Sequence, residues 1–108
     1  MAVTRDANGT QAATVTTEHS LSTRTSAGIY QLVVDLSNMV NGDEVELRVK
    51  HKVLSGSSAV LEEYAIYVNL QDIKVVRSVP IPSVDYIEFT LKQTVGTGRN
   101  FDWAVLKL

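Results

Sequence analysis

The sequence contains no cysteine, only two prolines and a single tryptophan. Without cysteine the chain can form neither a disulfide nor a thiolate zinc site, and it offers no cysteine nucleophile. It also lacks a signal-peptide core and any apolar run long enough to span a membrane. We therefore expect a soluble protein that is made in the cytosol and has no membrane partner.

Charge of one sign is not in excess either. Ten Lys and Arg oppose twelve Asp and Glu, for a formal net charge of -2, and neither sign clusters along the chain. A surface that binds nucleic acid would need a concentration of basic residues. No nucleic-acid partner is therefore expected.

Groups of residues that could carry out catalysis are equally scarce. Glu62 and Glu63 are adjacent, as are Glu18 and His19, and adjacent side chains on a strand point to opposite faces. The motif G-x-S-x-G is absent, and the two histidines are not spaced with other residues as metal ligands would be. The sequence predicts no catalytic residue, no cofactor site and no metal site, and we do not expect an enzyme.

What the sequence does contain is a strong β pattern. Val is the commonest residue, and β-branched side chains lose rotamer freedom in a helix but pack well on a pleated surface. From residue 27 onward apolar and polar residues alternate with a period of two, which is typical of strands with one buried face. Strands are predicted within residues 13–21, 28–36, 43–53, 59–70, 73–79, 86–95 and 99–108.

The segment 59–70, "AVLEEYAIYVNL", fits two interpretations. Its apolar residues also match a helical stripe, but the run Ile66, Tyr67 and Val68 is rich in strand-forming residues. The strand is favoured because the surrounding segments are all predicted strands.

Seven or eight short strands at this spacing predict an all-β fold, an antiparallel β-sandwich. A jelly-roll-like topology is favoured, and an immunoglobulin-like one remains the alternative. Asn41-Gly42 and the "GTG" at 96–98 carry the residues of tight turns, and we expect the second of these to close a hairpin.

The first 26 residues differ from the rest of the chain. Ten of the nineteen Ser and Thr lie within residues 1–27, together with few large apolar side chains. Such a segment buries too little to offset the entropy lost on ordering. We predict a polar N-terminal arm over 1–26, flexible over 1–12 and followed by a marginal first strand, and a sandwich domain over 27–108.

Several side chains invite a functional interpretation, and each has a simpler one. The charged row in "DEVELRVKHKV" (43–53) is most simply the solvated face of a strand. His51 is expected on the inner face with one hydrogen-bond partner, and Trp103 is expected to anchor the core. Tyr67 falls on the opposite face from Tyr64, so it is the candidate for exposure and for an interface.

Two stretches give the chain a family resemblance. The segments "AGIYQLVVDLS", "NGDEVELRV" and "VLSG", with the ending "FTLKQTVGTGRNFDWAVLKL", resemble a group of small virion proteins of tailed bacteriophages. The resemblance spans about residues 15–108 and rests on turn glycines and strand residues. It implies a β-sandwich or jelly-roll module that is displayed on the virion.

The role that the resemblance favours is capsid decoration. A decoration (cement) protein binds the outer surface of the shell of major capsid protein and stabilises it, and a dimer or trimer is expected by analogy. A tail- or fibre-associated binding module, which would recognise glycan, is the alternative. The expected partner-binding residues are, from the arm and from the exposed aromatic position, Val3, Thr4, Arg5, Val15 and Tyr67.

Overall fold

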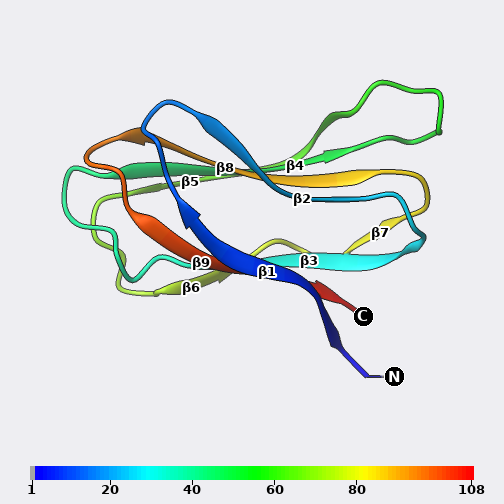
Figure 1. The fold of residues 1–108 in the computed structure, drawn as a ribbon, viewed down its shortest axis with the longest axis horizontal. Coiled ribbons are helices and arrows are strands. Elements are labelled where there is room, and N and C mark those ends of the chain that lie inside the picture. Colours follow the sequence, from blue (N-terminus) through cyan, green and yellow to red (C-terminus); the bar gives the residue numbers. More distant parts are fainter. Residues whose placement is uncertain (1) are drawn as a thin grey trace.

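The computed structural model describes residues 2–108, which form nine strands and contain no helix (Figure 1). The strands pair into two antiparallel sheets that pack face to face. Sheet I has the order β1–β9–β3–β6, with the short β7 also paired to β3, and sheet II has the order β2–β8–β4–β5. The bounds are β1 Thr4–Ala12, β2 Glu18–Arg24, β3 Gly28–Asp35, β4 Glu44–His51, β5 Val60–Val68, β6 Val75–Arg77, β7 Ile81–Ser83, β8 Ile87–Val95 and β9 Asn100–Lys107.

The predicted all-β sandwich is therefore confirmed, and so is the strand assignment of the ambiguous segment. Along β5 the exposed and less exposed residues alternate, which is the period of a strand and not of a helix. Its inward residues Ala65 and Tyr67 lie opposite Leu47 and Val45 of β4 in the register of sheet II. The apolar residues of 59–70 matched a helical stripe only because this strand carries apolar residues on both of its faces.

The core lies between the two sheets and is built from the inward rows of the strands. Tyr30, Phe89 and Phe101 are the largest fully buried side chains. Burying an aliphatic or aromatic side chain of this size contributes about 1.5–3 kcal/mol. The hydroxyl of Tyr30 remains satisfied because it donates a hydrogen bond to the carbonyl oxygen of Ser26, at 2.8 Å.

Most connections cross from one sheet to the other. Only the link between β4 and β5 joins consecutive strands that pair with each other. Gly42 has the positive φ expected of it, 100°, but its turn carries the chain from sheet I to sheet II. The "GTG" turn likewise links β8 of sheet II to β9 of sheet I, so the hairpin predicted there is wrong. Gly96 is required in that turn, because a Cβ built on it would lie 2.1 Å from Oδ1 of Asp43.

The N-terminal segment is not a flexible arm over its described part. Residues 4–12 form β1, which pairs with β9 from Thr4 opposite Lys107 to Ala12 opposite Asn100. The marginal strand expected within 13–21 is found a few residues later, as β2, and it pairs with β8. Few apolar side chains suffice here because the ladder satisfies the backbone groups of β1 along one side. Met1, at the start of the predicted arm, lies outside the described residues.

An ion pair between the buried Asp43 and the partly exposed Arg99 joins three loops at one end of the sandwich. Asp43 is 1% exposed, and its Oδ2 accepts hydrogen bonds from Nε of Arg99 at 2.8 Å and from the backbone N–H of Val40 at 3.0 Å. The carbonyl oxygen of Asp43 accepts the backbone N–H of Asn69 at 2.8 Å. Burial by itself raises the pKa of Asp43, but the Arg99 guanidinium and the backbone donors outweigh it and hold the pKa below its ordinary value.

Replacing Arg99 should therefore destabilise the fold. Arg99→Ala leaves the Asp43 carboxylate buried without its cation, and we expect the free energy of unfolding at pH 7 to fall by about 3 kcal/mol. The folded-state pKa of Asp43 lies below the unfolded value, so the stabilisation is present above about pH 4 and is lost as the pH falls through the folded pKa. Urea unfolding at pH 7 and pH 3 should show the gap between wild type and variant narrowing in acid. Arg77→Ala, on the exposed side of β6, is the control and should change stability by less than about 0.5 kcal/mol.

Candidate functional site

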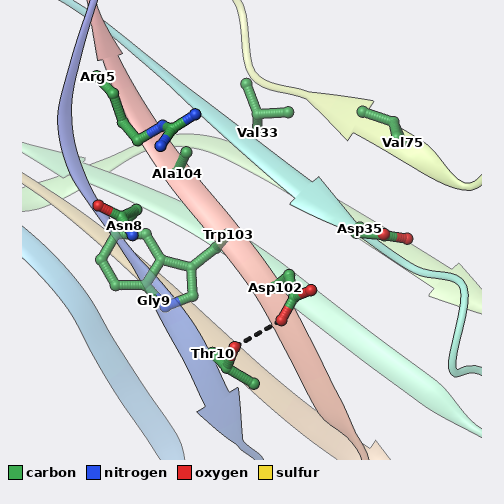
Figure 2. Close-up of a pocket in the computed structure, with 10 residues that line it drawn as sticks. All are labelled: Arg5, Asn8, Gly9, Thr10, Val33, Asp35, Val75, Asp102, Trp103 and Ala104. Carbon is green, nitrogen blue, oxygen red and sulfur yellow. Dashed lines mark hydrogen bonds between the residues drawn. The ribbon is translucent and has the colours of Figure 1, made fainter.

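The outer face of sheet I contains a wide, shallow depression of about 480 Å³ (Figure 2). Strands β1, β9, β3 and β6 cross it, so residues from both ends of the sequence form one surface. Apolar and polar side chains both line it. The residues that line it are Arg5, Asn8, Gly9, Thr10, Val33, Asp35, Val75, Asp102, Trp103 and Ala104.

The two carboxylates of this depression and the hydroxyl of Thr10 are held in place by hydrogen bonds. The hydroxyl of Thr10 donates a hydrogen bond to Oδ1 of Asp102 at 2.6 Å, across the pair β1–β9. Asp35 accepts hydrogen bonds from the hydroxyl and the backbone N–H of Ser37, and these hold its pKa below the ordinary value. Figure 2 shows Arg5 at the opposite end from Thr10 and Asp102. A partner would meet a cation at one end and fixed carboxylate acceptors at the other.

Three of the five expected partner-binding residues lie together beside this depression. Val3, which is 60% exposed, precedes β1, and Thr4 and Arg5 are the first residues of that strand. Val15 lies in the turn that follows β1, at the other end of the strand, and is half-buried. Tyr67 belongs to sheet II. The structure therefore groups Val3, Thr4 and Arg5 and separates them from the other two.

The prediction that Tyr67 is the exposed aromatic of its strand is wrong. Tyr67 faces the other sheet and packs against the core, and burial together with the nearby carboxylate of Glu63 raises the pKa of its hydroxyl. Tyr64, 44% exposed, stands on the outer face instead. The register against β4 decides this, because Tyr67 lies opposite the fully buried Val45.

A second surface was not predicted from the sequence at all. Large apolar side chains are exposed along β5 and along the chain that leads into β6, a region here called the apolar border. Sheet I and sheet II both end on this side of the sandwich, with β6 and β5 as their edge strands. A signal was present in the sequence, the uncharged run "YAIYV" at 64–68, but exposure was expected there only for Tyr67. The residues of the apolar border are Tyr64, Ile66, Val68, Leu70, Ile73 and Val75, which are 44–74% exposed.

The charged row of β4 is the outer face of sheet II, as expected. Its members pair with one another and with a neighbouring strand. Lys50 Nζ lies 2.7 Å from Oε2 of Glu18 on β2, and Arg48 Nη2 lies 3.2 Å from Oε2 of Glu46. The hydrogen bond from Lys50 is the main reason why the pKa of Glu18 is lowered. The guanidinium of Arg48 also lies over the ring of Tyr64, 5.3 Å from its centroid.

Both histidines have local partners. His51 Nδ1 lies 2.7 Å from Oε1 of Glu62, which confirms the expectation of one hydrogen-bond partner. His19 accepts the backbone N–H of Thr14 on Nε2, at 3.0 Å. Trp103 packs against the core, where its indole lies beside Gly9. Among residues 2–108 no three His, Asp or Glu side chains gather as metal ligands would. The same residues contain no helix suited to crossing a membrane.

Comparison with known proteins returned nothing. No protein-family model, no curated protein and no solved structure matches the chain. The interpretation of its function therefore depends on the sequence resemblance, the strand order and the two surfaces described above.

The position of β1 beside the depression depends on an ion pair that can be tested. Arg24 of β2 donates from Nε to Oδ2 of Asp6 at 2.5 Å and from Nη2 to the carbonyl oxygen of Asp6 at 2.8 Å, and these bonds join the two sheets along their β1–β2 side. Asp6 sits where the β1–β9 register shifts. Arg24→Ala should cost about 1 kcal/mol, since both side chains are partly exposed.

The local effect should exceed the global one. Hydrogen exchange measured by mass spectrometry should show faster exchange in peptides from β1 of Arg24→Ala, while the matched surface variant Ser20→Ala, also in β2, leaves β1 protected as in wild type. Unchanged protection of β1 in Arg24→Ala would show that the ladder with β9 holds the strand without the ion pair.

Proposed function

We propose that this chain is a structural protein of a tailed-bacteriophage virion, a decoration protein that binds the outside of the major capsid protein shell and stabilises it. The observation that carries the proposal is the strand order. If the short β7 is omitted, the first strand pairs with the last, the second with the one before the last, and so inward to β4 with β5. We assign this nested pairing to a jelly roll.

The strand order also speaks against the immunoglobulin-like alternative. In immunoglobulin domains the first two strands lie in the same sheet. Here β1 belongs to sheet I and β2 to sheet II. Jelly rolls recur in viral capsid proteins and in lectins, so the strand order supports a virion role by fold-level analogy, alongside the sequence resemblance.

The proposed attachment surface is the outer face of sheet I, with the exposed chain that leads into it. Val3 and Arg5 are exposed at one end of the depression, and a convex part of a shell protein could fit into it. A modest contact is sufficient there, because a decoration protein occurs in many copies on a symmetric lattice and multivalent binding raises its avidity. The proposal assigns this chain no catalytic residue, cofactor or metal.

A second candidate function is a tail- or fibre-associated module that binds glycan. The depression itself favours it, because a shallow groove with fixed carboxylates and an amide, from Asp35, Asp102 and Asn8, offers hydrogen-bond partners for sugar hydroxyls. The two candidates differ in stoichiometry. A shell protein is present in hundreds of copies per particle, and a neck, baseplate or fibre component in a dozen or fewer.

Copy number on purified virions of the phage that encodes the chain is therefore the first test. We expect quantitative mass spectrometry to give hundreds of copies per particle, and electron microscopy to place the corresponding density on the shell. A dozen copies or fewer, with density at the tail, would overturn the decoration role and favour the glycan-binding module.

The attachment surface is tested by point variants, because deleting residues 1–20 would remove β1 and part of β2 and so disrupt both sheets. Val3→Asp places a charge on an exposed apolar residue at the proposed contact and should lower shell occupancy at least about tenfold, the equivalent of 1.4 kcal/mol. Val84→Asp is the matched control, since Val84 is similarly exposed, 69% against 60%, and lies outside the depression. Equal occupancy of the two variants would place the attachment elsewhere.

A further inference from the structure

Among residues 2–108 the two sheets have five edge strands, and four of them are protected against pairing with another strand. β6 and β7 have only three residues each, and β1 and β2 are polar strands whose registers shift at a bulge. Short edges, charged side chains and bulges are the usual means of preventing edge-to-edge association. The fifth edge strand, β5, differs from all of them.

β5 is a long edge strand with a regular and uncharged second half. It has nine residues, and within the described chain β4 is its neighbour on one side while no strand covers the other. The register shift lies near its beginning, between Val49 and Lys50 of β4, so Glu63–Val68 pair without interruption. Residues 64–68 carry neither charge nor proline. A row of backbone N–H and C=O groups is therefore presented beside exposed apolar side chains.

We propose that a second copy of this chain pairs with β5 in antiparallel fashion, so that the two sheets II form one continuous sheet across a two-fold axis at Ile66. The sequence of the strand is self-complementary in this register. On the outer face Tyr64 lies opposite Val68 of the second copy, and Ile66 lies opposite itself. On the inner face Ala65 lies opposite the second copy's Tyr67, a small side chain against a large one, and this happens twice by symmetry.

The acidic residues select this arrangement over the alternatives. Glu62 and Glu63 lie at one end of the strand, just before the uncharged run. In the antiparallel pair the two copies of Glu63 are about 20 Å apart along the strands, beyond the screening length at physiological salt. A parallel pair would set them on neighbouring strands about 5 Å apart, where like charges repel. The charge pattern therefore fits a second copy in one orientation.

The rest of the apolar border would extend the contact. Leu70, Ile73 and Val75 are 50–74% exposed and lead from β5 to β6 on the same side of the sandwich. The backbone N–H of Val79, just after β6, points to the carboxylate of Glu63 at 3.3 Å, which places the two edge strands next to each other. In a two-fold pair the open edge of β5 in each copy is covered by β5 of the other. No open β5 edge remains, so the assembly closes as a dimer and does not grow into a filament.

This inference goes beyond the proposed function, because it concerns the isolated chain and does not require a shell. Sedimentation velocity of the purified protein at 1–100 µM should show a dimer. Ile66→Lys places two charges on the two-fold axis and should give a monomer with an unchanged circular dichroism spectrum. Val84→Lys, at an exposed apolar position away from β5, is the control and should remain dimeric, although Val84 is 69% exposed against 45% for Ile66. A monomeric wild type at 100 µM, or a dimeric Ile66→Lys, would overturn the proposal.

The register is tested separately by disulfide trapping, which the absence of natural cysteine makes clean. Directly opposed positions place Cβ atoms about 4.5–5.5 Å apart, close to the range that a disulfide bridges. Ile66→Cys should therefore form a covalent dimer on mild oxidation. Tyr64→Cys should not, because its two copies are about 13 Å apart along the strands. Cross-linking of Tyr64→Cys as fast as Ile66→Cys would overturn the register, whatever the copy number on virions.

Discussion

The structure depends on one constraint, the burial of alternate side chains between two pleated sheets. A strand sends successive side chains to opposite faces, so each strand gives one row to the core and leaves one row outside. In β4 the inner row is Val45, Leu47 and Val49, while charged residues occupy the outer row. The outer rows are not constrained by core packing. They form the depression on sheet I and the charged surface of sheet II.

The second consequence of this architecture is that it leaves edges. The two open sheets present five edge strands within the described residues, and each must be short, polar, irregular or covered if the protein is to stay apart from its neighbours. The chain uses the first three devices on β6, β7, β1 and β2 and none of them on the second half of β5. The same few residues of β5 then carry both an unpaired backbone and an exposed apolar row, and Val75 of β6 lies where this apolar border meets the depression of sheet I.

The buried polar groups explain how so many crossings between sheets are held in place. Asp43 joins the loops that follow β3, β5 and β8, and the buried amide of Gln93 donates to the carbonyl oxygens of Val95 and Thr97 while accepting the N–H of Arg99. Loops that change sheets cannot use the ladder to satisfy their backbone groups. Side chains that hydrogen-bond to them take over that role at this end of the sandwich.

The sequence by itself determined the longer strands from residue 28 onward, because apolar residues at every second position favour a half-buried strand. It did not predict the short β7, where Pro82 interrupts the pattern. It did not determine the place of residues 4–12, whose partner β9 lies at the other end of the chain and supplies backbone hydrogen bonds that composition does not reveal. Nor did it determine which face of β5 is buried, since both rows are apolar and only the register against Val45 decides that Tyr67 points inward. Turn residues indicated where the chain reverses, but which sheet receives it depends on contacts between distant strands. The candidate surfaces belong to this second category, because each combines outward side chains from strands that only the tertiary pairing brings side by side.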